Sequence, residues 1–305
     1  MDQRQKYLVV IAGPTGVGKT ALAIKLAKHF NTKIISADSR QFYREMNIGT
    51  AKPSQKELEE AEHLFINSLS IHDTYSIGDF EKDALQKLDE LFKDHPLVFM
   101  VGGSGLYINA VLYGVDEFED VSPETKAKIK KEYEEKGISW LQEQLQKLDP
   151  EYYGSVDINN PQRLQRALEV CMESGKPYSS FLSGTKKQRA FEPIKLLINL
   201  DREILYDRIN KRVDQMIADG LIDEAKKLYP YKDLNALNTV GYKELFAHFD
   251  GQIDLNAAIE LIKQKTRNYA KRQLTWFKNQ DTYEEFGPDD LEKIKAYLEI
   301  ILQNS

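Results

Sequence analysis

The segment from Gly13 to Thr20 reads GPTGVGKT and matches the pattern G-x-x-x-x-G-K-[ST]. This pattern is typical of a loop that holds phosphate groups, because its glycines let the backbone turn tightly and point several N–H groups inward. Lys19 adds a positive charge, and the hydroxyl of Thr20 can bind Mg²⁺. We therefore predict a phosphate site formed by Gly13, Pro14, Thr15, Gly16, Val17, Gly18, Lys19 and Thr20. The alternative is a glycine turn in an ordinary α/β protein.

Asp38 is the candidate for acid–base chemistry beside this loop. It follows the apolar run KIISA at residues 33–37. In an open parallel sheet, ligands bind where the carboxyl ends of the strands meet, so Asp38 is placed to act as a general base. The alternative roles for Asp38 are the cap of a helix or turn and a ligand of a metal ion.

A further apolar run, LVFMVGG at residues 97–103, ends without a carboxylate. Kinases and nucleotide hydrolases usually have an acidic residue at such a strand end, where it helps to hold the metal ion. Here the chain continues into Ser104 and Gly105. The sequence therefore predicts a phosphate site but leaves open whether a phosphate group is transferred.

Basic residues gather near the C-terminal end of a chain that is acidic overall. The segment 263–278 contains no acidic residue and six basic ones, Lys263, Lys265, Arg267, Lys271, Arg272 and Lys278. Tyr269, Trp276 and Phe277 lie among them, and basic residues mixed with aromatic ones suit RNA binding. The alternative is an amphipathic helix that buries Leu274 and Phe277 and leaves its lysines in solvent.

The elements that must position these residues follow an α/β pattern. Apolar runs at residues 7–12, 33–37, 97–103 and 195–200 are typical of buried parallel strands, and helical patterns separate them. Strand-like runs disappear between about residues 115 and 190. Helix signals replace them, at Ser122-Pro123 to Gly137, from Ser139 onward, and at Asn160-Pro161 to Gly175. Two further long helices are predicted at residues 202–218 and 257–279.

We therefore predict a P-loop NTPase-like parallel sheet flanked by helices, with a helical insertion. The catalytic core comprises residues 1–114 and 191–305, and the insertion comprises residues 115–190. On the third predicted helix of the insertion, Arg163 and Arg166 share one face and could bind phosphate, although surface arginines often face only solvent. Cys171 on the same helix is predicted to be a small buried residue, because no histidine is placed to activate it.

Composition limits the functional classes. The chain has 305 residues, of which 41% are hydrophobic, so it can bury a substantial core. With 48 acidic and 42 basic residues its net charge is -6, and a nucleic acid would have to bind a local basic surface. The single cysteine, the absence of zinc spacing and the lack of a long apolar run indicate a cytoplasmic protein without a membrane segment. A monomer is the default expectation.

Six blocks of the sequence, read in order, resemble the tRNA dimethylallyltransferases, also called tRNA isopentenyltransferases. They are GPTGVGKT (13–20), DSRQFYREMNIGTAKP (38–53), VGGSGLY (101–107), QRLQRALEV (162–170), GYKEL (241–245) and TRNYAKRQLTWF (266–277). Two small departures are Glu62-His63, where the family often has two histidines, and Asn159-Asn160, where it often has Asn-Asp. No cysteine/histidine finger follows, so the chain resembles a bacterial form.

The resemblance implies a reaction in which no phosphoryl group is transferred. The phosphate loop would hold the diphosphate of dimethylallyl diphosphate together with Mg²⁺. The N6 atom of adenosine 37, beside the anticodon of tRNA, would attack the allylic carbon, and pyrophosphate would leave. The missing acidic strand end then has a reason, because the protein need only stabilise a departing diphosphate.

The resemblance also implies roles for individual residues. Asp38 would accept the N6 proton, and Lys19, Thr20 and Arg212 would neutralise the pyrophosphate. Binding of the tRNA anticodon stem-loop would involve Asp38, Ser39, Arg40, Gln41, Ser104, Gln162, Arg163, Leu164, Gln165, Arg166, Lys271 and Arg272. Two other classes of function compete with this interpretation. A small-molecule or nucleotide kinase would also use the phosphate loop and Asp38, with ATP as its ligand, and a nucleotide-dependent RNA-binding switch would use the basic segment.

Overall fold

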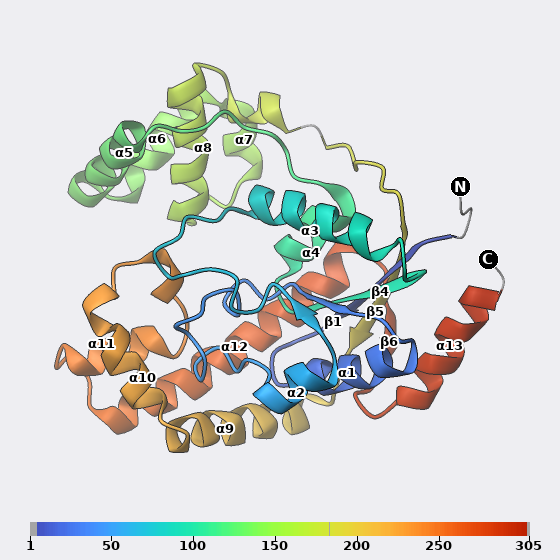
Figure 1. Ribbon diagram of the computed structural model, residues 1–305. Helices are drawn as coiled ribbons and strands as arrows, with labels where there is room; N and C mark the ends of the chain where they lie inside the picture. Colours follow the sequence, from blue (N-terminus) through green and yellow to red (C-terminus); the bar gives the residue numbers. More distant parts are fainter. Residues whose placement is uncertain (1–4, 183, 304–305) are drawn as a thin grey trace. The chain divides into compact units, whose positions relative to one another are not determined.

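The computed structural model describes residues 5–182 and 184–303. The chain forms two compact units, one made of Met1–Tyr113 with Gln188–Ser305 and the other of Gly114–Lys187 (Figure 1). The borders predicted from sequence were 114 and 191 for the core, and 115 and 190 for the insertion.

The larger unit is built on a six-stranded sheet with the order β3-β2-β4-β1-β5-β6. Its strands are β1 (Tyr7–Ala12), β2 (Ile34–Ser36), β3 (His63–Leu64), β4 (Leu97–Gly102), β5 (Glu192–Ile198) and β6 (Glu284–Phe286). Every neighbouring pair is parallel. The central strands β1 and β4 are buried along their whole length, as expected for strands covered on both faces. The predicted α/β fold is confirmed.

Helices cover both faces of the sheet, because successive side chains of a strand point to opposite faces. On β1, Val9 and Ile11 pack with α1 (Lys19–His29), α9 (Arg202–Ala218) and α13 (Leu291–Gln303). Leu8 and Val10 pack on the other face with α3 (Ile77–Leu91), α4 (Gly105–Tyr113) and Phe277 from the end of α12 (Leu255–Gln280). The layers of helix, sheet and helix are visible in Figure 1.

Further helices form a third apolar cluster beside the sheet. It contains residues of α9, α12, α10 (Leu221–Leu228) and α11 (Tyr242–Phe249), with Tyr242 fully buried. Short 3-10 turns, η2 (Tyr229–Tyr231) and η3 (Asn235–Leu237), connect α10 to α11. The short helix α2 (Gln55–Glu60) begins at a capping box in which Ser54 and Glu57 bond to each other's backbone N–H.

The smaller unit is a helical bundle. It contains α5 (Pro123–Lys136), α6 (Ile138–Leu148), α7 (Pro150–Ser155), α8 (Pro161–Ser174) and η1 (Tyr178–Phe181). Ser122 and Asn160 cap α5 and α8 as predicted, with Gly137 and Gly175 at the other ends. The helix expected from Ser139 begins one residue earlier. Cys171 is buried, and burial raises the pKa of its thiol, which confirms the predicted packing role.

The described residues include no helix that combines the length and the apolar character needed to cross a membrane.

Candidate functional site

Three loops leave the same edge of the sheet in the larger unit. Their strands, β1, β2 and β4, are neighbours or next neighbours, and the strand order reverses at this point, which is where open α/β sheets bind ligands. The loops carry Lys19, Asp38 and Ser104. The N–H of Ser39 lies 3.5 Å from the hydroxyl of Ser104. The fold therefore brings together three candidates that are far apart in the sequence.

The phosphate loop forms an anion cradle at the start of α1. The Nζ of Lys19 donates to the carbonyl oxygens of Gly13 and Pro14, each at 2.8 Å. Within the described part of the chain, the N–H groups of Gly18, Lys19 and Thr20 have no hydrogen-bond partner, as is usual at a helix start. Gly13 has a φ of 151°, and a Cβ there would lie 2.4 Å from the carbonyl oxygen of Ile198. The N–H donors and the positive end of the α1 dipole therefore favour an anion at the start of this helix.

The cations of the site are held in a partly desolvated setting. Burial lowers the pKa of Lys19 to about 7, while Asp38 opposes this shift and Arg212 adds to it. Burial also lowers the pKa of Arg212, again against the charge of Asp38. Arg212 lies on α9 and donates to the carbonyl of Ala51 at 3.4 Å. The charge of Asp38 acts on the pKa of both Lys19 and Arg212, so the three groups are close enough to interact electrostatically.

One carboxylate oxygen of Asp38 accepts a hydrogen bond within the loop to which Asp38 belongs. Its Oδ1 accepts from the N–H of Arg40 at 3.0 Å, which is the turn-capping role left open by the sequence. In the described residues, Oδ2 has no hydrogen-bond partner. Asp38 can therefore cap the turn and still present an acceptor to a substrate.

The residues after Asp38 bond mainly to the protein. Arg40 Nη1 donates to the carbonyls of Asn235 and Ala236 at 3.0 and 2.9 Å. Gln41 is buried, and its Nε2 donates to the carbonyls of Thr50 and Ala51 at 3.2 and 3.3 Å. These two side chains hold neighbouring loops in place, which leaves Ser39 as the half-buried member of the predicted group.

The loop after these residues is fixed by a carboxylate from α10. Glu224 accepts from the N–H groups of Asn47, Ile48 and Gly49 at 3.0, 2.9 and 3.0 Å. It also accepts from the phenol of Tyr242 at 2.7 Å. Between this loop and α9 lies a cavity of about 510 Å³ that Arg212 helps to line.

One face of α12 lies against the loops of the site and was missed by the sequence analysis. Tyr269, Gln273 and Trp276 are spaced four and three residues apart, so they share a face. Burial raises the pKa of the Tyr269 phenol, and the negative charge of Asp38 adds to this shift. The spacing of aromatic and amide residues was the signal that could have revealed this face.

The basic segment of α12 divides into paired and unpaired residues. Lys263 pairs with Asp214 and Glu260, Lys265 with Glu244, and Lys278 with Glu285, while Arg267 bonds to Asn210. Lys271 and Arg272 are exposed and have no carboxylate partner among the described residues. Arg272 lies over the ring of Tyr269 at 5.8 Å. The alternative of an amphipathic helix holds for Phe277, which is fully buried, and for Leu274, which packs beside it.

In the helical unit, the predicted tRNA-binding residues of α8 differ in exposure, because they lie on different faces of the helix. Gln162, Arg163 and Arg166 are exposed, and Gln165 is half-buried. Arg166 lies 5.3 Å from the ring centre of Phe118 and 3.6 Å from Glu169. Leu164 is fully buried in the bundle core, because its position on α8 faces inward, so its side chain has no surface for RNA. We therefore remove Leu164 from the tRNA contacts.

The fold and the loop geometry define a P-loop-type α/β protein with an acceptor carboxylate in place of an acidic strand end. Comparison with known proteins gives the particular family. Residues 41–280 match the IPP transferase family, and the chain belongs to that family, the tRNA dimethylallyltransferases.

Relatives match along nearly the whole chain. A protein of Christiangramia forsetii named tRNA dimethylallyltransferase is 58% identical over 294 residues, covering 96% of this chain and 97% of its own. One of the same name from Flavobacterium johnsoniae is 55% identical over 282 residues, covering 90% and 91%.

Solved structures match as well. The tRNA isopentenylpyrophosphate transferase of Bacillus halodurans has a TM-score of 0.73 at 35% identity and covers 98% of both chains. A eukaryotic dimethylallyltransferase acting on tRNA has a TM-score of 0.78 at 28% identity, covering 94% of this chain and 75% of its own.

Proposed function

We propose that this chain is a tRNA dimethylallyltransferase that transfers the dimethylallyl group of dimethylallyl diphosphate to N6 of adenosine 37 of tRNA, releasing pyrophosphate. The observation that carries the proposal is the complete phosphate cradle beside the open oxygen of Asp38, on a strand edge where β4 ends in glycine instead of a carboxylate. Its family membership and the names of its relatives support the same reaction. We place the reaction in the cytoplasm, where its tRNA substrate is found.

The reaction needs one bond made and one broken. N6 of the adenine attacks the allylic carbon while the bond from that carbon to the diphosphate oxygen breaks. The N6 proton passes to Asp38, and the electron pair leaves with pyrophosphate. Lys19, Arg212 and the N–H groups at the start of α1 stabilise the negative charge that develops on the departing oxygen.

A Mg²⁺ ion fits this donor set. Magnesium prefers oxygen ligands and is usually held by a few protein groups together with substrate phosphates. The Thr20 hydroxyl at the start of α1 supplies one such oxygen, and the diphosphate would supply others. Among the described residues there is no cluster of three or more His, Cys, Asp or Glu that could hold a metal by itself. The ion would add positive charge beside the leaving group.

Binding of the tRNA anticodon stem-loop is assigned to exposed and half-buried residues of both units. In the larger unit these are Ser39, Ser104, Lys271 and Arg272, with Asp38 at the reacting base, and Arg40 and Gln41 support the loop. In the helical unit they are Gln162, Arg163, Gln165 and Arg166. The adenine must leave its stack to reach Asp38, which costs a few kcal/mol.

The test separates transfer of a prenyl group from phosphoryl transfer. Purified protein is incubated with Mg²⁺, dimethylallyl diphosphate and unmodified tRNA, with no nucleotide present. We expect pyrophosphate and an adenosine beside the anticodon that is heavier by one dimethylallyl group. If product forms only after ATP is added, or if ATP is split to ADP at a comparable rate, the site belongs to a kinase or a nucleotide switch.

A further inference from the structure

A buried glutamine connects the two loops that would hold the two substrates. Gln273 lies on α12 and is only 7% exposed. Its Oε1 accepts from the N–H of Thr15 in the phosphate loop at 2.9 Å. Its Nε2 donates to the carbonyl oxygen of Gly103, directly before Ser104, at 2.9 Å. One side-chain amide thus uses both of its ends on two different loops.

The bridge formed by Gln273 lies just beyond the paired ends of β1 and β4. Strands β1 and β4 are paired in register up to Ala12 and Gly102, and beyond that pair the two chains turn apart into their loops. The amide of Gln273 bridges Gly103, the first residue past β4, and Thr15, the third residue past β1, where backbone pairing has ended. It therefore sets the spacing between the two loops.

Glycines allow α12 to come this close. A Cβ at Gly103 would lie 2.2 Å from Nε2 of Gln273. A Cβ at Gly105 would lie 2.1 Å from the ring of Trp276, which follows on the same helix face. Ser104 is therefore held between two close contacts with one helix, and its position depends on α12.

We propose that Gln273 is a positioning residue that fixes the distance between the bound diphosphate and the loop that receives the adenine. This role rests on the proposed function, in which the phosphate loop holds the electrophile and Ser104, beside the loop of Asp38, contacts the tRNA. The reacting atoms must come within about 3 to 3.5 Å with their orbitals aligned, and an error of about 1 Å can slow a reaction roughly 100-fold. Gln273 does not touch the reacting atoms and acts through the two backbones.

The test replaces the amide by a side chain of similar length that can neither accept nor donate. We expect Gln273→Met to lower the single-turnover rate at saturating substrates roughly 10- to 100-fold. The dissociation constants of dimethylallyl diphosphate and tRNA should change by less than about threefold, because each substrate still finds its own loop. The matched control is Phe277→Leu, which loosens buried packing one turn further on in the same helix, at a side chain that can make no hydrogen bond to either loop. It should keep a rate close to that of the wild type when both variants are folded.

A second variant distinguishes positioning from general loss of structure. Gln273→Glu keeps an acceptor for Thr15 but can donate to Gly103 only when its carboxyl group is protonated. Burial raises the pKa of a carboxyl group. The rate of this variant relative to the wild type should therefore rise as the pH falls from about 8 to about 6.

The outcomes separate this inference from the proposed function. If the wild type forms no prenylated tRNA, the proposed function fails and the role of Gln273 fails with it. If the wild type is active but Gln273→Met is slowed no more than Phe277→Leu at equal thermal stability, the positioning role alone is overturned. A relative rate of Gln273→Glu that does not change with pH would contradict the donor half of the bridge.

Discussion

Asp38 and Lys19 carry opposite charges, and burial lowers the pKa of Lys19 while the charge of Asp38 opposes that shift. Lys19 would be a permanent cation in water, yet burial brings its pKa to about 7. Asp38 keeps one oxygen on its own turn and offers the other. The role of each of these two side chains can be tested by a single substitution.

Replacing Asp38 by asparagine should remove the base without disturbing the turn. The Oδ1 of asparagine can still accept from the N–H of Arg40, so the loop is expected to stay in place. Because an amide cannot take up the N6 proton, the single-turnover rate should fall roughly 10²- to 10⁴-fold with binding of both substrates retained. A variant that reacts within about threefold of the wild type would remove Asp38 from the role of base.

Binding of the diphosphate should bring a proton onto Lys19 above pH 7. With its pKa lowered to about 7 in the free protein, Lys19 is mainly neutral at higher pH, and a nearby diphosphate favours the charged form. Proton uptake on binding dimethylallyl diphosphate should therefore be larger at about pH 8 than at about pH 6. Calorimetry in buffers of different ionisation enthalpy measures it. Lys19→Met is the control, and equal uptake in this variant would assign the proton to another group.

At the scale of elements, α12 has a buried face and an exposed face, and the number of its basic residues does not tell the two faces apart. Its buried face holds the loops through Gln273 and Trp276, while Lys271 and Arg272, directly before Gln273, are exposed to solvent. Most of the other cations on the helix pair with carboxylates of neighbouring elements, α9, α11 and β6. Only part of the basic segment is therefore available to RNA phosphates.

The salt dependence of tRNA binding can identify that part. The slope of log affinity against log salt changes by about 0.7 to 0.9 for each phosphate contact. Lys271→Ala combined with Arg272→Ala should flatten this slope by roughly one to two. The matched pair Lys265→Ala and Lys278→Ala removes as much charge from the same helix, but these ammonium groups already face Glu244 and Glu285. Equal flattening by both double variants would show a diffuse charge effect and no specific contact.

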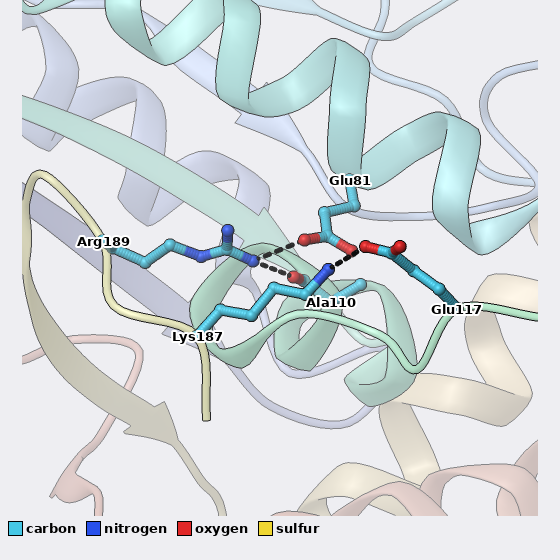
Figure 2. A network of polar contacts seen from close by, with 5 residues as sticks. All are labelled: Glu81, Ala110, Glu117, Lys187 and Arg189. Carbon is cyan, nitrogen blue, oxygen red and sulfur yellow. Dashed lines mark hydrogen bonds and ion pairs between the residues drawn. The ribbon is translucent and has the colours of Figure 1, made fainter. Parts of the chain in front are cut away.

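At the scale of the whole molecule, a buried ion pair secures the chain where it returns to the larger unit. Arg189 precedes β5, and its Nη2 donates to Glu81 of α3 at 2.7 Å and to the carbonyl of Ala110 of α4 at 2.8 Å (Figure 2). The two charged side chains are 11% and 9% exposed. A second pair, Lys187 with Glu117, is 42% and 86% exposed.

These two pairs should differ in what they contribute to stability. Arg189→Met should lower the free energy of unfolding by about 3 kcal/mol, because it removes a buried guanidinium that pairs with the buried Glu81. Adding Glu81→Gln should recover part of that loss. Lys187→Met, which removes an exposed cation, should cost less than about 1 kcal/mol. Urea unfolding at unchanged slope measures all three, and equal losses for Arg189→Met and Lys187→Met would contradict a special role for burial.

The sequence by itself determined the features that depend on neighbours along the chain. The glycines and Lys19 of the phosphate loop, the valine- and isoleucine-rich strands, and the caps at Ser122 and Asn160 act over a few residues, so their patterns can be read locally. The resemblance of six ordered blocks added the family, because their joint occurrence is far more specific than any one loop.

Only the tertiary structure decided which side chains meet across the chain. Thr15 and Gln273 are separated by 258 positions, and Glu224 reaches Ile48 over 176, so no local pattern signals either contact. The same holds for the pairs of Lys263 with Asp214 and of Lys265 with Glu244, which join different helices. It also holds for Leu164, which is buried although Arg163 beside it is exposed. A side chain's partner and exposure depend on which helix face packs inward and on what lies opposite. Folding settles both by burying apolar surface and pairing the polar groups buried with it.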